Sequence, residues 1–168
     1  ACLCHCGVFH MLPYALSCLY LDKQPAYLER IRESCERSLA AQHAEGWYPC
    51  NCSGGNVHNP NRFEGGAFTN GSVGEAMLVA AKVLDEKKYA DSSRRAAKDY
   101  KLYDYEFNEN YCAFALWHLS EFYEQTGETQ FLDRAVYYAE NFAGRDIGPG
   151  GSQDGHNFYT GYGAITLK

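Results

Sequence analysis

Long uncharged apolar runs are missing from this 168-residue chain, and their absence excludes a membrane-spanning helix. A span needs about 18 such residues, whereas the most apolar segment, 8–21, is shorter and is interrupted by His10 and Pro13. A basic run is missing too, because Lys and Arg are interleaved with Asp and Glu and the formal net charge is -6. The sequence therefore has no electrostatic footprint for nucleic acid. We expect neither a membrane nor a nucleic acid as a partner.

Alternating β-branched residues are absent as well, so nothing supports a sheet beyond short pieces in loops. Six segments show helical periodicity instead, and they fall into two alternating classes. The inner helices are apolar nearly all round, as expected for helices buried on every side, and they cover 8–21, 73–84 and 111–123. The outer helices have one apolar and one charged face, and they cover 27–41, 89–103 and 131–142.

The connections between these helices alternate in the same way. Each inner helix leads to the next outer helix through a short link, where an aromatic residue, a small or aliphatic residue and an acid recur, beginning at Tyr27, Tyr89 and Phe131. This spacing of ~40 to 60 residues fits one helical hairpin per repeat. The outer-to-inner segments are 45–71, 104–110 and 144–160, and two of them are long and rich in Gly.

Antiparallel hairpins of this kind stack as a solenoid or close into concentric rings, and either arrangement puts all outer-to-inner loops on one face. Long loops without structure of their own are usually functional, so we expect the site on that face. The sequence thus predicts one all-α domain over 1–168, an α/α toroid of about three hairpins that forms a partial ring.

Three segments resemble the six-hairpin, or (α/α)6 toroid, superfamily of glycoside hydrolases, polysaccharide lyases and sugar epimerases. They are the hairpin-like 116–142, the sequence EGWYPC at 45–50, which is similar to Gly-Trp substrate loops, and GHNFYTGYGAITLK at 155–168. The resemblance implies a carbohydrate-active enzyme, hydrolase or lyase, that acts on an oligosaccharide or polysaccharide without a cofactor or metal. A full ring needs about twice this many hairpins, so it also implies an incomplete chain, with an oligomer or a missing second half completing the ring.

Enzymes of this group work with carboxylates, or with His, Tyr and Arg, so the ionisable loop residues are the catalytic candidates. We predict that Asp154 or Glu64 acts as proton donor or base and that His156 relays or orients the proton. The predicted substrate-binding residues are Trp47, Tyr48, Arg62, Tyr105 and Tyr159, of which Trp47 is the main sugar-stacking candidate.

Each candidate also has a purely structural interpretation. Asp154 is a good turn former, and Arg62 can pair with Glu64 within their loop. Trp47 and Tyr48 can fasten their loop to the core. His118 and Glu121 lie inside an inner helix, where a core His satisfied by a hydrogen bond is more common than a ligand.

Eight cysteines are many for a cytosolic domain, which favours a secreted or periplasmic location over a cytoplasmic one. Cys18, Cys35 and Cys112 lie in apolar helical patterns and are expected to be small core residues. The other five lie with His5 in turn-like sequence, in two groups that we expect to be near each other: Cys2, Cys4 and Cys6, and Cys50 and Cys52. Disulfides, free thiols and a zinc site all remain open for these groups.

Two other functions remain open. A non-catalytic helical repeat would bind glycan or protein on its concave face. The sequence LCHCGV at 3–8 is similar to the Cys-His-Gly segment of the lanthionine cyclases, zinc-holding helical toroids, although Cys6 separates His5 from Gly7. A catalytic site would bring two ionisable groups from different loops into one pocket, whereas a binding module would spread its acids along a shallow aromatic groove.

Overall fold

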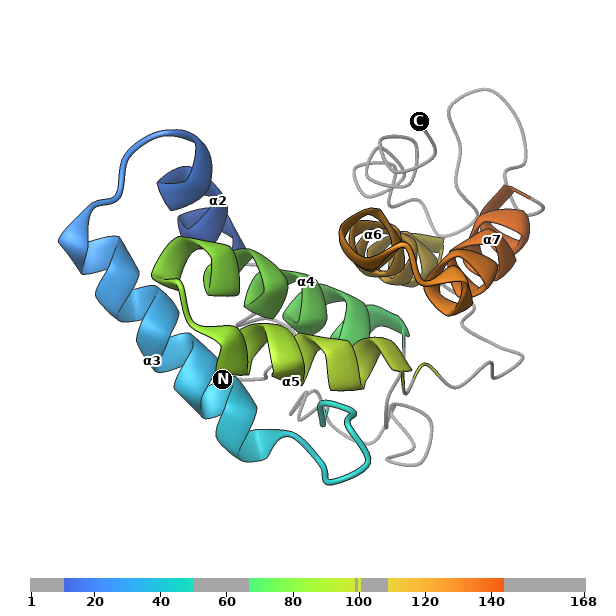
Figure 1. Cartoon of the computed structure of the whole chain (residues 1–168), viewed down its shortest axis with the longest axis horizontal. Helices are drawn as coiled ribbons and strands as arrows, with labels where there is room; N and C mark the ends of the chain where they lie inside the picture. Colours follow the sequence, from blue (N-terminus) through green and yellow to red (C-terminus); the bar gives the residue numbers. More distant parts are fainter. Residues whose placement is uncertain (1–10, 50–66, 99, 101–108, 144–168) are drawn as a thin grey trace.

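The computed structural model of the chain describes residues 11–49, 67–98, 100 and 109–143. Within these ranges the chain is helical apart from short turns, and it contains no strand, so the predicted all-α class is confirmed. No helix in the same ranges has the length and apolarity needed to cross a membrane. The helices, labelled in Figure 1, are α2 (Leu12–Tyr20), α3 (Pro25–Ala41), α4 (Ala67–Leu84), α5 (Lys87–Lys98), α6 (Glu109–Thr126) and α7 (Thr129–Ala143).

Consecutive helices pair as three hairpins, α2 with α3, α4 with α5, and α6 with α7. The predicted short links separate the two helices of each hairpin. Two links reverse the chain at left-handed residues, Asp85 with φ 56° and Gly127 with φ 68°. A left-handed residue after the last helical turn is a common way for a helix to end, which explains why these links are so short.

The inner helices α4 and α6 lie side by side and run in the same direction. Near their beginnings Gly71 lies against the backbone of Phe114, and near their ends Lys82 pairs with Glu121. α2 packs against another side of α4. The inner helices therefore form a row with α4 in the middle.

The outer helices are parallel to one another as well. Their contacts keep the same order along each helix: Arg32 with Glu86 and then Gln42 with Ser92 between α3 and α5, and Arg94 with Glu128 and then Arg134 with the Ala97 carbonyl between α5 and α7. Each hairpin thus has the same orientation as the hairpin before it in the chain. The chain leaves every outer helix, and enters α4 and α6, at the same end of the array.

One helix boundary differs clearly from the prediction. α4 begins at Ala67, inside the segment 45–71 that was expected to be a loop. Residues 69–72 are Thr, Asn, Gly and Ser, which are weak helix formers, so their sequence resembles a loop. Tertiary contacts override this weak propensity, since Thr69, Asn70 and Ser72 are buried and the Asn70 side chain bonds two other segments. α6 likewise begins at Glu109, within the predicted loop 104–110.

Burial separates the inner helix α4 from the three outer helices, as predicted. α4 is buried from residue 69 to residue 81, whereas α3, α5 and α7 each bury one face. α2 does not fit the prediction of a helix buried on every side, because Tyr20 is 75% exposed and the adjoining Leu21 is 84% exposed. The reason is its place at the edge of the row, where α3 and α4 are its main neighbours.

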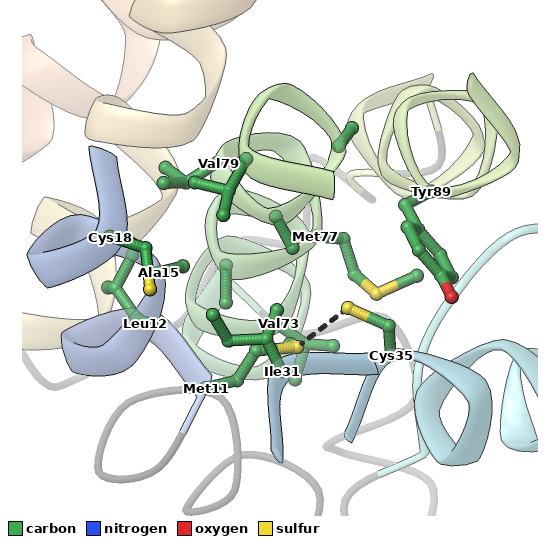
Figure 2. Close-up of a cluster of buried hydrophobic side chains, with 14 of the residues drawn as sticks. Met11, Leu12, Ala15, Cys18, Ile31, Cys35, Val73, Met77, Val79 and Tyr89 are labelled. Atoms are coloured by element: carbon green, nitrogen blue, oxygen red, sulfur yellow. Dashed lines mark hydrogen bonds between the residues drawn. The ribbon is translucent and has the colours of Figure 1, made fainter. Parts of the chain in front are cut away.

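Two apolar clusters fill the array, one between α2, α3, α4 and α5 and one between α4, α5, α6 and α7. Figure 2 shows the first, where the Cys35 thiol donates to the Met11 sulfur at 3.3 Å. Cys18 and Cys35 are free and buried, which confirms that they are core residues. The side chain of Cys112 lies outside the described part.

Candidate functional site

Most of the predicted site residues lie outside the described residues, so the predictions that rest on them stay predictions. They are Glu64, Arg62, Tyr105, Asp154, His156 and Tyr159, together with Cys2, Cys4, His5, Cys6, Cys50 and Cys52. Among the residues that are described, no group of three His, Cys, Asp or Glu side chains is arranged to hold a metal ion.

Trp47 is described, and its ring is largely enclosed. The indole is 9% exposed, stacks on the His43 ring with centroids 4.3 Å apart, and donates from Nε1 to Glu45 at 3.2 Å. His43 thus covers the ring face that a sugar would need on that side. This geometry matches the structural interpretation, in which Trp47 fastens its loop.

Tyr48 is a core residue. Its backbone N–H donates to the Asn70 side chain at 2.9 Å, and its hydroxyl lies 2.7 Å from Ser92 Oγ. Ser92 donates to Gln42 at 2.7 Å, so the Tyr48 hydroxyl is the donor toward Ser92. Complete burial raises the pKa of the phenol above its usual range. Tyr48 therefore ties the segment after α3 to α4 and α5, as its structural interpretation requires.

Gly46 explains why this segment has a Gly before the Trp. Its φ of +113° is unfavourable for residues with a side chain, and an added Cβ would lie 2.7 Å from the carbonyl oxygen of Arg95. The Gln42 side chain donates to the Gly46 carbonyl at 2.6 Å and to the Ser92 carbonyl at 2.8 Å. The glycine of the Gly-Trp pattern is thus required by the close approach of this segment to α5.

His118 is a satisfied core histidine, which confirms the prediction. Its ring is fully buried, with Nε2 2.8 Å from Ser93 Oγ and Nδ1 2.9 Å from the Tyr100 hydroxyl. Ser93 donates to the Gly74 carbonyl at 2.6 Å, so it accepts from His118 Nε2 and the neutral ring accepts from Tyr100. Burial lowers the pKa of His118 to about 3. The imidazole has no free nitrogen to take the serine proton, so this is no nucleophile–base pair.

Glu75 is the ionisable group that the sequence reasoning missed. It lies within α4 in the segment expected to be apolar, and it is 1% exposed. No hydrogen-bond partner of its Oε2 atom is found in the described part of the chain. Burial raises its pKa to about 8, repulsion from Glu121 adds to this, and Lys82 opposes it. Buried carboxyls without a partner are rare in proteins, and a carboxyl that stays protonated near neutral pH can donate a proton.

The direction of Glu75 follows from helix geometry. Glu75 and Lys82 are seven residues apart, which puts them on one side of α4 about two turns apart. Lys82 pairs with Glu121 of α6 at 3.4 Å, so this side adjoins α6. The Asn70 side chain, which bonds α5, points about 140° away around the helix. Glu75 therefore lies on the side of α4 that is turned away from the outer helices.

We call Glu75, Lys82, Trp117 and Glu121 the inner-face group. Trp117 lies one turn before Glu121 on α6, is half-buried and packs against the first apolar cluster. A sequence signal for this group exists, since Glu75 is the one charged residue in 67–81. Periodicity alone conceals it, because a single acid hardly changes the pattern of an apolar helix.

Comparisons with protein-family models, with curated proteins and with solved structures found no match for this chain.

Proposed function

We propose that the chain forms part of a carbohydrate-active enzyme, a glycoside hydrolase or a polysaccharide lyase, built as a partial α/α toroid. The observation that supports this best is the parallel order of the hairpins. Parallel hairpins gather the outer-to-inner segments at one end of the array, and those segments are rich in carboxylates and aromatic residues. Three hairpins are half of a six-hairpin ring, which a second half or an oligomer would complete.

The chemistry follows from the residues of those segments. Cleavage of a glycosidic bond needs a proton donor and a base or nucleophile, and elimination needs a base near an acidified carbon. Asp154 or Glu64 would exchange the proton, and His156 would orient it. Arg62, Tyr105 and Tyr159 would contact the sugar.

A panel of oligosaccharides that includes unsaturated uronides tests this proposal. We expect turnover of at least one member, followed by mass spectrometry, and a loss of 100-fold or more in the variant Asp154→Asn. The amide keeps the size and turn propensity of Asp154 but cannot transfer a proton, so circular dichroism and thermal unfolding should be unchanged.

Asp146→Asn, the same change in the same segment, is the matched control and should keep the activity. Full turnover in Asp154→Asn would remove this residue from the mechanism. Binding of oligosaccharides without turnover would contradict the enzyme and favour the non-catalytic glycan-binding repeat.

A further inference from the structure

We propose that a second copy of this chain covers both free sides of the hairpin row, with the α6–α7 hairpin of each copy packed against the α2–α3 hairpin of the other. Figure 1 shows these two hairpins on opposite sides of the α4–α5 hairpin. Two copies with three hairpins each would close a ring of six. The inference rests on the partial ring of the proposed function, whose missing partner it names, and not on the activity.

The three outer helices begin in the same register, so their residues can be compared position by position. Each helix has its aromatic residue, Tyr27, Tyr89 or Phe131, in the third place. The backbone N–H of this aromatic residue donates to the carbonyl three residues before it, at 2.9, 3.2 and 3.0 Å respectively. Equivalent positions therefore point to equivalent sides of the row.

Both contacts between neighbouring outer helices use the same pair of positions. Arg32 and Arg94 each lie five residues after the aromatic residue of their own helix. They pair with Glu86 and Glu128, which each lie three residues before the aromatic residue of the next outer helix. The same ion pair thus joins the first hairpin to the second and the second to the third.

Other contacts between hairpins follow the same arrangement. The Tyr89 hydroxyl donates to Glu36, nine residues after the aromatic residue of α3, at 2.6 Å. Arg134, three residues after the aromatic residue of α7, donates to the Ala97 carbonyl of α5 at 3.0 Å. An outer helix therefore contacts the hairpin before it with its aromatic side. It contacts the hairpin after it with positions five and nine, which lie about 140–180° around the helix.

Burial of the aromatic residue shows where a neighbouring hairpin is missing. Tyr89 and Phe131 are fully buried, and each has an outer helix of the preceding hairpin against it. Tyr27 is only half-buried, since no hairpin precedes it in the described part of the chain. The aromatic side of α3 is thus built like a hairpin contact but is left open.

The two free sides carry groups that fit each other. On α7, positions five and nine are Val136 and Glu140, and both are exposed. On α3, the aromatic side consists of Gln24, Tyr27 and Arg30, of which Gln24 and Arg30 are exposed. Neither Glu140 nor Arg30 forms an ion pair with another described residue. One free side thus has an unpaired acid and the other an unpaired cation.

The contacts inside the chain show how these groups would meet. Glu140 is equivalent to Glu36, so it would accept from the Tyr27 hydroxyl of the second copy as Glu36 accepts from Tyr89. Arg30 is equivalent to Arg134, which reaches the end of the preceding outer helix. In the second copy Arg30 would therefore lie near Glu140 and supply the opposite charge. Complementary charges of this kind favour one register of association.

Apolar residues mark the same two sides. Where the contacts inside the chain have an Arg–Glu pair, the free sides have Val136 and Gln24, and Val136 is 45% exposed. The other large apolar residues that are exposed in the described ranges are Tyr20 and Leu21, beside the link of the first hairpin. All three lie on the end hairpins and none on the middle one. Association of the two ends would remove these side chains from water.

Sedimentation equilibrium of the 168-residue chain tests the association without any sugar. We expect a mass twice the 18.9 kDa of the chain at micromolar concentrations. A monomer at all concentrations would overturn the inference, and masses that keep growing with concentration would overturn the closed ring. A dimer that turns over no oligosaccharide would overturn the proposed activity alone. A monomer that turns one over would overturn this inference alone.

A charge reversal tests the polar contact. Glu140→Lys would put a cation opposite Arg30, and we expect the dissociation constant of the dimer to rise about 10-fold or more. Glu124→Lys is the matched control, because this exposed residue lies one turn from Glu121 on the side of α6 that adjoins α4. Equal dissociation constants of the two variants would contradict the contact.

Two double variants test whether Val136 and Gln24 face each other. Val136→Arg with Gln24→Glu rebuilds the Arg–Glu pair of the contacts inside the chain, and this variant should associate at least as tightly as the wild type. Val136→Glu with Gln24→Glu places two like charges together and should raise the dissociation constant about 10-fold. Circular dichroism should be unchanged in both, since both positions are exposed. Equal dissociation constants of the two double variants would overturn the proposed pairing of the free sides.

Discussion

Two buried ionisable residues of the inner helices, His118 and Glu75, differ in the number of hydrogen bonds that their surroundings supply. His118 has a partner on each ring nitrogen, whereas Glu75 Oε2 has none among the described residues. The sequence predicted the state of His118, because a histidine inside an apolar helix is usually a satisfied core residue. The sequence could not predict the state of Glu75, because that state depends on which side chains of neighbouring helices come within hydrogen-bond distance of its carboxyl.

Replacement of His118 by Phe should make the free energy of unfolding less dependent on pH in the acidic range. The folded pKa of about 3 lies below the unfolded value of 6.5, so the wild type loses stability as pH falls from about 6.5 toward 3, while His118→Phe has no such group. Urea unfolding should show the wild type more stable at pH 7, because Phe leaves Ser93 and Tyr100 without this partner. The difference should shrink by about 2 kcal/mol between pH 7 and pH 5. A difference that is equal at the two pH values would contradict the buried neutral histidine.

At the scale of the helices, most of the order and type of the elements could be predicted and several boundaries could not. Alternation of apolar and amphipathic segments identified all six described helices. The predicted beginning of α4 was wrong, because Asn70 and its neighbours are held in the helix by tertiary contacts, which local helix propensity does not reflect. The burial of α2 was overestimated, because periodicity shows how apolar a helix is and not how many neighbours it has.

The contact between α4 and α6 supplies a test of the helix packing. A Cβ added at Gly74 would lie 2.2 Å from Cε1 of His118, whose ring is fixed by two hydrogen bonds. We expect Gly74→Ala to lower the free energy of unfolding by about 1–3 kcal/mol, although Ala is the better helix former. Gly127→Ala adds a methyl group where nothing lies within 4 Å, so it should cost about 1 kcal/mol through its positive φ alone. Equal or greater stability of Gly74→Ala in denaturant unfolding would contradict the packing of α4 on α6.

At the scale of the whole molecule, the repeated hairpin was the most predictable feature. The recurring links at Tyr27, Tyr89 and Phe131 indicated that successive hairpins have the same orientation. The parallel contacts between the outer helices agree with this. The candidate site was less predictable, since loop composition directed attention to residues such as Asp154 and Trp47. Trp47 lies against His43, and the buried carboxyl of Glu75, whose Oε2 atom has no hydrogen-bond partner among the described residues, lies on a helix instead.

The central claim is that a carboxyl is buried in protonated form on the inner face, and the pH dependence of stability tests it without any substrate. The folded pKa of Glu75, about 8, lies above its ordinary value of 4.5, so folding takes up a proton between these values. The wild type should therefore lose stability relative to Glu75→Gln as pH rises, by up to about 1.4 kcal/mol per pH unit.

The measurement is the free energy of unfolding of wild type and Glu75→Gln in urea, at intervals from pH 4 to pH 9. The account predicts curves that lie closest together near pH 4, separate by about 3 kcal/mol between pH 5 and pH 8, and run parallel above that range. Parallel curves across the whole range would mean that Glu75 ionises as freely in the folded protein as in the unfolded chain, and would contradict the account.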